Sequence, residues 1–320
     1  MSGPTIGLML PAIANTDTNR VDPPRLLAAA RLAEAAGFDG VYVGDHLLHP
    51  RPLLEAVVTL SAVAATTRTL SIGTCVMLVA LRDPLWLAKQ LGTLAAFAPG
   101  RLRIGIGLGG EYPAEFAAAG VPLPERGRRA ETALAEIRDL LAGRRRPTPA
   151  EDGMIVGIDP VPGADVPILL AGWKEVALRR AARLGDGWIG YLLSPDSFTR
   201  RRDQLLGYRA ERGGAPFITG MLLPIHPDPA ANAHARAGAA WKRLTGANAT
   251  FPERLFVAGG ADAIVEQLHS YWQRGCTEMV LSLVDMGDAF PGQLDLLCER
   301  VLPEVRKFGK NRAEGRIHHD

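Results

Sequence analysis

The sequence has little cysteine and no long apolar run. Only three of its 320 residues are cysteine (Cys75, Cys276 and Cys298), and no two of them form a CxxC pair. This scarcity argues against a disulfide framework or a thiolate zinc site, and it is typical of a reducing cytosol. No stretch of about 18 apolar residues occurs, so we expect no membrane span. The first residues also lack the charged and apolar regions of a secretory signal, and we therefore expect a cytoplasmic protein.

Strong charge imbalance and metal-binding motifs are absent as well. The formal net charge is +2, which gives no electrostatic reason to expect nucleic acid as a partner. His46 and His49 lie close together, but no HxH or HExxH pattern occurs, and we expect no metal site. The GxxxxGK[ST] phosphate loop and the GxSxG nucleophile elbow are missing too, so neither chemistry is expected.

Short apolar segments alternate with helical patterns along the whole chain. The predicted strands are residues 5–10, 39–44, 70–75, 102–106, 167–170, 187–190, 217–223 and 278–283. The predicted helices are residues 23–36, 53–67, 84–97, 129–142, 175–184, 194–212, 228–246, 262–274 and 292–307. Because such alternation builds a parallel sheet by right-handed crossovers, eight strands predict an α/β fold, a closed (β/α)8 TIM barrel. We expect one domain over residues 1–320, with insertions after the helix that follows strand four and after strand seven. An open doubly wound sheet is the alternative.

A glycine cluster ends the fourth predicted strand. Residues 101–110 read RLRIGIGLGG, and Glu111, Glu115 and the basic residues Arg126, Arg128 and Arg129 follow. Glycine lets a ligand approach the backbone closely and adopts positive φ freely. The stretch therefore predicts either a cofactor cradle at the end of a strand or a glycine-rich turn without a ligand.

Polar residues follow several other predicted strands. Asp45 and His46 come directly after strand two, and Thr74 and Cys75 end strand three. In a (β/α)8 barrel the active site lies at the carboxyl ends of the strands, so these side chains should converge. An imidazole can carry a proton near neutral pH, which makes His46 a candidate acid/base group. The alternative is a histidine that only hydrogen-bonds a neighbouring loop.

Two helix starts suit an anion. Arg126, Arg128 and Arg129 lie at the start of a predicted helix, where backbone N–H groups and the helix dipole favour negative charge. Gly172, Trp173 and Lys174 open the helix after strand five in the same way. A solvated helix face is the alternative for the arginines, but two such starts on consecutive loops favour phosphate binding.

These features together resemble the luciferase-like flavin-dependent oxidoreductases, a family that includes bacterial luciferase and the coenzyme F420-dependent dehydrogenases and reductases. The resemblance is collinear over roughly nine-tenths of the chain. Its segments are residues 33–46 (AEAAGFDGVYVGDH), 71–76 (SIGTCV), 83–110, 125–143, 167–189 and 257–283. It implies a (β/α)8 barrel that binds a flavin-type cofactor at the carboxyl ends of the strands.

The resemblance also implies roles for individual residues. A non-prolyl cis peptide is expected at Cys75–Val76 behind the cofactor ring, and the acid/base candidates are His46 and Glu111. The implied cofactor-binding residues are Asp45, Thr74, Cys75, Val76, Leu108, Gly109, Gly110, Arg126, Arg128, Ala171, Gly172, Trp173 and Lys174. The chain departs from the family at Ala171, Gly172 and Trp173, where relatives usually read Gly-Gly-Ser. A hydroxyl contact to the phosphate is therefore lost, and a backbone amide or Lys174 is expected in its place.

The reaction implied is hydride transfer between coenzyme F420 and a small organic substrate, with His46 moving the proton. The alternatives are an FMN-dependent monooxygenase that uses O2 and a partner flavin reductase, and a non-catalytic flavin-binding relative of luciferase. The protein's part in either reaction is binding, orientation and exclusion of water. We expect a homodimer, as is common in the family.

Overall fold

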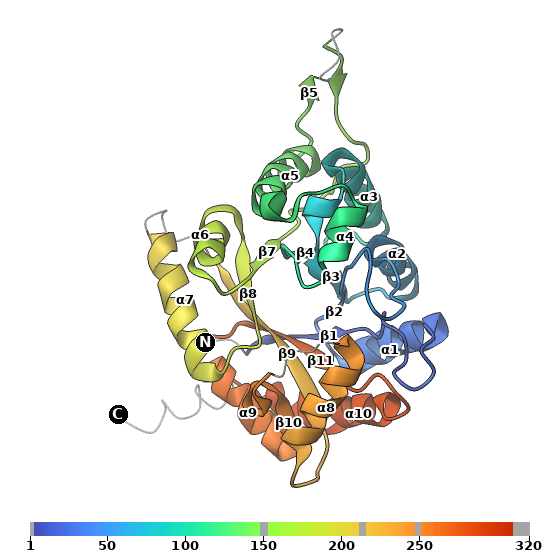
Figure 1. The fold of residues 1–320 in the computed structure, drawn as a ribbon, viewed down its shortest axis with the longest axis vertical. Helices are drawn as coiled ribbons and strands as arrows, with labels where there is room; N and C mark the ends of the chain where they lie inside the picture. The colour runs from blue at the N-terminus through green and yellow to red at the C-terminus, as the bar shows by residue number, and fades with distance from the viewer. Residues whose placement is uncertain (1–2, 148–152, 211–215, 247–250, 310–320) are drawn as a thin grey trace.

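Within residues 3–147, 153–210, 216–246 and 251–309, which the computed structural model describes, eight parallel strands close into a barrel (Figure 1). In order around the barrel they are β1 (Thr5–Met9), β2 (Gly40–Val43), β3 (Ser71–Met77), β4 (Leu102–Ile106), β7 (Ile168–Ala171), β8 (Gly187–Tyr191), β9 (Ile218–Pro227) and β11 (Glu278–Leu283). The barrel closes because β8 pairs with β9 and β11 pairs with β1. The predicted TIM barrel is confirmed, and the open sheet is excluded.

Helices surround the barrel in the ring that Figure 1 shows. They are α1 (Pro23–Ala36), α2 (Ala56–Thr66), α3 (Pro84–Phe97), α4 (Pro113–Ala118), α5 (Arg126–Leu141), α6 (Glu175–Leu184), α7 (Pro195–Ala210), α8 (Ala233–Thr245), α9 (Ala261–Gln273), α10 (Phe290–Leu296) and α11 (Leu302–Val305), with a π turn over Leu297–Val301. Local chemistry sets several of their ends. The Asp22 and Asp83 carboxylates accept hydrogen bonds from the backbone at the starts of α1 and α3, each of which has proline at its first position. Gly37 ends α1 with φ of 88°.

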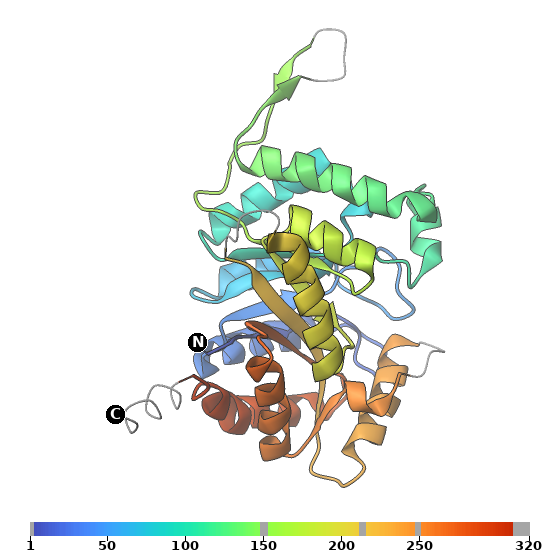
Figure 2. The same cartoon turned by 90° about the vertical axis from the view of Figure 1, so that its left-hand side faces the viewer.

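The observed elements differ from the predicted ones mainly where an element is very short. α4, with six residues, and β10 (Val257–Gly259), with three, were not predicted because neither is long enough to show periodicity. β9 runs to Pro227, four residues beyond its predicted end, because its last residues pair with β10 outside the barrel. Both expected insertions are present. The first forms a hairpin of β5 (Arg146–Pro147) and β6 (Ile155–Val156) that projects from the barrel (Figure 2); part of the predicted loop, residues 148–152, lies outside the described residues.

The barrel interior is filled at the amino-terminal end of the strands. The Tyr42 hydroxyl donates to Glu278 Oε1 at 2.8 Å, and Arg103 Nη1 lies 2.7 Å from Glu278 Oε2. Glycines make room for the Tyr42 ring, since a Cβ added at Gly7 would lie 2.5 Å from it. Above this network lies an apolar layer formed by Tyr42, Cys75, Ile189 and Val280. The interior therefore opens only at the carboxyl ends of the strands.

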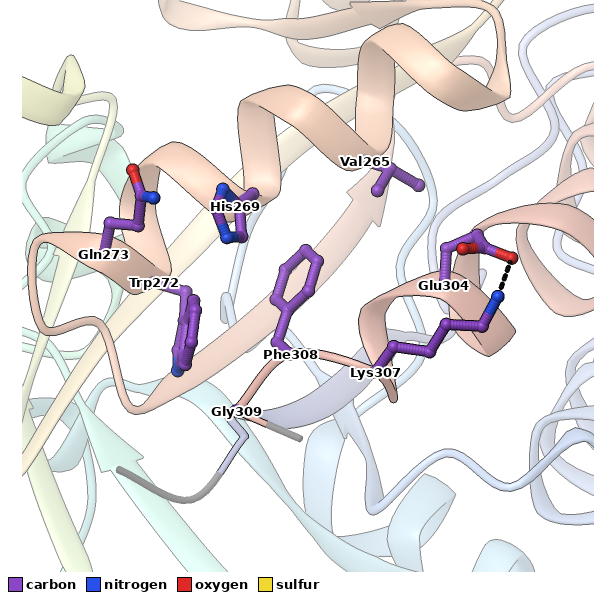
Figure 3. A pocket seen from close by; sticks show the side chains of 8 residues that line it. All are labelled: Val265, His269, Trp272, Gln273, Glu304, Lys307, Phe308 and Gly309. Atoms are coloured by element: carbon purple, nitrogen blue, oxygen red, sulfur yellow. Dashed lines mark hydrogen bonds and ion pairs between the residues drawn. The ribbon is translucent and has the colours of Figure 1, made fainter. Parts of the chain in front are cut away.

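A separate cavity of about 310 Å³ lies between α9 and the chain after α11 (Figure 3). Its walls include His269, Trp272 and Phe308, whose rings pack together with centroids 4.8–5.4 Å apart. A Cβ added at Gly3, which precedes β1, would lie 2.8 Å from the Phe308 carbonyl oxygen. This cavity therefore belongs to the amino-terminal end of the barrel, away from the predicted site. No helix within the described ranges is long and apolar enough to cross a membrane.

Candidate functional site

His46 follows β2 at the open end of the barrel and is held by a buried carboxylate. Its Nδ1 lies 3.2 Å from both carboxylate oxygens of Glu115, a fully buried residue of α4. Glu115 Oε2 also accepts the Leu47 N–H at 3.1 Å, which fixes the carboxylate. The tautomer of His46 that donates to an ionised Glu115 carries its proton on Nδ1. Nε2 is then left with a lone pair that can take a proton from a substrate.

A second histidine lies next to it. His49 Nδ1 is 3.0 Å from the Arg51 backbone nitrogen and 3.2 Å from the Arg51 carbonyl oxygen. His49 Nε2 lies 3.2 Å from the Tyr112 hydroxyl, which in turn donates to the Thr245 carbonyl at 3.1 Å. Burial lowers the pKa of His49, which keeps the ring neutral. This chain of bonds ties the loops after β2 and β4 to the end of α8.

Asp45 is engaged by the protein itself. Its Oδ2 accepts the Leu78 N–H at 3.0 Å, and Arg82 Nη2 lies 2.6 Å from its Oδ1. Arg82 also pairs with Glu55 at 3.0 Å, and the two carboxylates raise its pKa against the opposing effect of burial. These bonds make Asp45 hold the loop after β3, and its predicted contact with the cofactor stays a prediction.

The end of β3 has the backbone expected of it. The Cys75–Val76 peptide is cis, and the Thr74 hydroxyl donates to the Gly105 carbonyl at 2.9 Å. Beside it, a Cβ added at Gly107 would lie 2.4 Å from Val76 Cγ2, so only glycine fits there. Cys75 is buried, and that burial raises the pKa of its thiol well above the usual range.

The glycines after β4 face one arginine of the predicted basic cluster. Gly109 and Gly110 have φ of 61° and 115°, and a Cβ at Gly110 would lie 3.3 Å from Arg126 Nε. That Nε is buried and has no hydrogen-bond partner among the described residues, whereas Nη1 donates to the Leu123 carbonyl at 2.8 Å. Arg128 is 75% exposed and pairs with Glu125 at 2.7 Å. The structure therefore brings Arg126, and not Arg128, to the glycine loop.

Another arginine nearby was missed by the sequence reasoning. Arg180, on α6, is only 10% exposed and its Nε lies 2.8 Å from Glu131. Its Nη2 would lie 3.3 Å from a Cβ added at Gly127, and its Nη1 is buried with no partner in the part of the chain that the structure describes. Two buried donors without acceptors among the described residues, one at the start of α5 and one on the middle of α6, fit the phosphate of a flavin-type cofactor. The signal available in the sequence was an arginine on the helix that follows the Gly172 loop.

The loop after β7 keeps its backbone form without the usual glycine pair. Gly172 has φ of 123°, and its carbonyl accepts the Trp188 indole N–H at 2.6 Å. Ala171 packs against the apolar layer inside the barrel. Trp173 and Lys174 are exposed, with the Lys174 ammonium 5.8 Å from the Trp173 ring centre. Neither side chain makes a contact with the glycine loop that the structure records among its described residues.

Glu111 lies at the rim of the open end and is exposed. Burial and then the charge of Glu111 raise the pKa of Tyr112 and of Tyr191, the last residue of β8. Among the described residues, the carboxylate in contact with His46 belongs to Glu115, which was named in the sequence without a role. The assignment of Glu111 as a second acid/base group stays a prediction. No group of three or more His, Cys, Asp or Glu in the described ranges could hold a metal ion.

Comparison with known proteins places these features in a wider group. A family model described as luciferase-like monooxygenase matches residues 6–290. An F420-dependent glucose-6-phosphate dehydrogenase from Beutenbergia cavernae is 39% identical over 180 residues, which are 52% of this chain and 52% of that protein. The chain thus spans about half the length of that relative.

Two solved structures have the same fold. An F420-dependent secondary alcohol dehydrogenase, in complex with an F420–acetone adduct, superposes with a TM-score of 0.79 at 19% identity over 96% of this chain and all of that one. The monooxygenase RslO1 from Streptomyces bottropensis gives a TM-score of 0.78 at 20% identity over 95% and 99% of the two chains. Similarity at this identity supports the barrel alone.

Proposed function

The chain belongs to the luciferase-like monooxygenase family of oxidoreductases, and on that premise we propose that it transfers hydride between coenzyme F420 and a small organic substrate. The observation that carries the proposal is the His46–Glu115 pair, which leaves Nε2 of His46 free at the open end of the barrel. Two relatives matched over about half of the chain are named F420-dependent glucose-6-phosphate dehydrogenases.

The roles of the residues follow from their contacts. The deazaflavin, when bound, supplies the centre that accepts or donates a hydride. His46 Nε2 takes the hydroxyl proton as an alcohol becomes a carbonyl, and returns it in the reverse direction. Glu115 holds the ring and stabilises the imidazolium that forms. An alcohol oxidised in this way would give up one hydride and one proton, and His46 would receive the proton.

Binding of the cofactor falls to the surrounding loops. The loop after β4, with glycine at positions 107, 109 and 110, is the wall that we assign to the cofactor ring, because its backbone can be approached closely. Arg126 and Arg180 offer buried donors for its phosphate. The Tyr112–His49 bond joins the β4 loop to the β2 loop beside His46.

Cofactor titration tests this proposal. Purified protein is titrated with F420 and with FMN, and binding is followed by fluorescence quenching. We expect F420 to bind and FMN not to bind. In the Arg126→Ala variant, affinity for F420 should fall about tenfold or more because a charge-assisted phosphate contact is lost. Arg128→Ala is the matched control, since its exposed side chain pairs with Glu125 in the described part of the chain, and the variant should bind F420 as the wild type does.

Other outcomes would replace the proposal. Tight FMN binding with no response to F420 would make the protein an FMN-dependent monooxygenase that needs a flavin reductase as partner. Failure to bind either cofactor would favour a non-catalytic relative.

A further inference from the structure

A second, much smaller cavity lies between strands β4 and β7 of the barrel and helices α5 and α6 (Figure 1). Its volume is about 10 Å³, which leaves room for one water-sized solute. The residues that line it are Ile106, Leu108, Ala130, Leu134, Leu170, Ala171 and Arg180. Among these described residues, Arg180 has the only polar side chain. The cavity is therefore an apolar space with a guanidinium in its wall.

Arg180 brings to this cavity a buried donor that lacks an acceptor. Its side chain is 10% exposed, and its Nε lies 2.8 Å from Glu131 Oε1. The other oxygen of Glu131 is bound by Arg183. Burial would raise the pKa of Glu131, but the hydrogen bonds from the two arginines outweigh it and lower that pKa, so the carboxylate is ionised. Nη1 of Arg180 is buried and has no hydrogen-bond partner within the described ranges.

The chemistry of the lining favours an anion over water in this cavity. A water molecule inside a protein makes about three hydrogen bonds, and it needs acceptors for its own hydrogens as well as donors. The guanidinium of Arg180 only donates, and the apolar side chains around it offer no acceptor. A monatomic anion has no hydrogens, and a positive charge in surroundings of low dielectric constant attracts it strongly. The site therefore fits a halide ion better than water.

We propose that the cavity beside Arg180 binds a halide ion such as chloride in the cofactor-free protein. Nη1 of Arg180 holds the ion, and the apolar side chains of β4, β7 and α5 pack around it. This binding does not depend on the cofactor. A regulatory consequence rests on the proposed function, which assigns Arg180 to the cofactor phosphate. Because a phosphate oxygen and a halide cannot both occupy Nη1, chloride competes with the cofactor.

Thermal unfolding in matched salts tests the halide site. The full-length protein is unfolded in mixtures of sodium chloride and sodium gluconate at constant ionic strength. A halide with a dissociation constant of about 50 mM should raise Tm by about 2–4 °C in 300 mM chloride relative to gluconate. Arg180→Met should lose this difference between the salts, whatever its own stability. Arg179→Met is the matched control, because it removes an exposed arginine of the same helix, and it should keep the difference.

Anomalous diffraction locates the ion without any variant. Crystals of the cofactor-free wild type, soaked in sodium bromide, should show a bromide peak in contact with Arg180 Nη1. This measurement decides the proposal even if Arg180→Met does not fold. A single water molecule in the cavity, with bromide confined to exposed arginines, would overturn the inference. The same conclusion would follow if Arg180→Met kept the full chloride effect on Tm.

Cofactor titration tests the regulatory consequence. With a dissociation constant of about 50 mM for chloride, the apparent Kd for F420 should rise about sixfold between 10 and 300 mM chloride at constant ionic strength. Arg180→Met should bind F420 independently of chloride. Chloride-specific stabilisation of a protein that ignores F420 would reject the proposed function and keep the halide site. F420 binding that is insensitive to chloride, in a protein that holds bromide at Arg180, would overturn the competition.

Discussion

At the scale of single residues, the chemistry of the site depends on which nitrogen of His46 carries the proton. Glu115 is the only described carboxylate in contact with that ring, and it is fully buried. A buried carboxylate that accepts from both His46 and Leu47 N–H fixes the ring orientation as well as the tautomer.

Replacing Glu115 should therefore change the tautomer of His46. In Glu115→Leu the Nδ1 proton loses its acceptor, and the ring should revert to the Nε2–H form that free imidazole side chains prefer. Glu115→Gln should keep the Nδ1–H form, because the amide oxygen still accepts. Long-range ¹H–¹⁵N NMR of the histidine rings measures the two states directly, with His49 as internal reference. An unchanged His46 spectrum in Glu115→Leu would remove Glu115 from the mechanism.

At the scale of elements, glycines set how closely neighbouring strands and loops approach. A Cβ added at Gly73 in β3 would lie 2.0 Å from the Arg103 carbonyl oxygen of β4. Since that atom belongs to the backbone, it cannot move aside without disturbing the β3–β4 pairing, which runs directly into the cis peptide and the glycine loop.

Gly73→Ala should destabilise the protein by about 2 kcal/mol or more, as expected when a buried site is overfilled. Gly207→Ala is the matched control, because Gly207 lies in α7 and a Cβ there meets nothing within 4 Å. That change should stabilise by about 0.5–1 kcal/mol through helix propensity. Urea unfolding measures both. Equal stability of the two variants would mean that β3 and β4 can separate at little cost.

Elements of normal length could be predicted from the sequence, whereas pairs of side chains could not. The strands at 102–106 and 278–283 and the helices at 23–36 and 84–97 have the predicted bounds because their apolar periodicity is complete. The cis peptide at Cys75–Val76 was expected from the family resemblance. Glu115 was missed because its contact with His46 joins residues 69 positions apart through the six-residue α4.

Helical phase could have separated two of the predicted residues. Arg126 and Arg128 are two positions apart on α5, which turns their side chains by about 200° relative to one another. Only one of them can face the glycine loop, and the structure shows that it is Arg126. The buried residues of α5 set which of its faces meets the barrel; they include Ala130, Ala133, Leu134 and Ile137. The face of the helix that packs on the barrel could therefore have been predicted from the sequence.

At the scale of the whole molecule, a polar network inside the barrel joins strands that are not neighbours. Tyr42 lies on β2, Arg103 on β4 and Glu278 on β11, and in the barrel order β3 and β1 lie between them. Burial, the largest cause, and the nearby Glu278 carboxylate raise the pKa of the Tyr42 hydroxyl, so it remains a donor. The network fills the closed end of the barrel and leaves the opposite end for ligands.

Removing one charged side chain of this network should lower the free energy of unfolding more than removing both charges. Arg103→Met would leave the Glu278 carboxylate buried with only the Tyr42 hydroxyl, at a cost of about 2–4 kcal/mol, below the full range for a buried pair because the Arg103 side chain is 27% exposed. Adding Glu278→Gln removes the stranded charge, so the double variant should recover about half of that loss or more. Urea unfolding of the wild type, both single variants and the double variant at neutral pH gives the coupling energy.

Arg144→Met, which breaks an exposed pair with Asp139, should change stability by less than about 0.5 kcal/mol and controls for the loss of a surface arginine. If the losses in the two single variants simply add, the strands are held by backbone pairing and packing alone, and the network serves only to fill space.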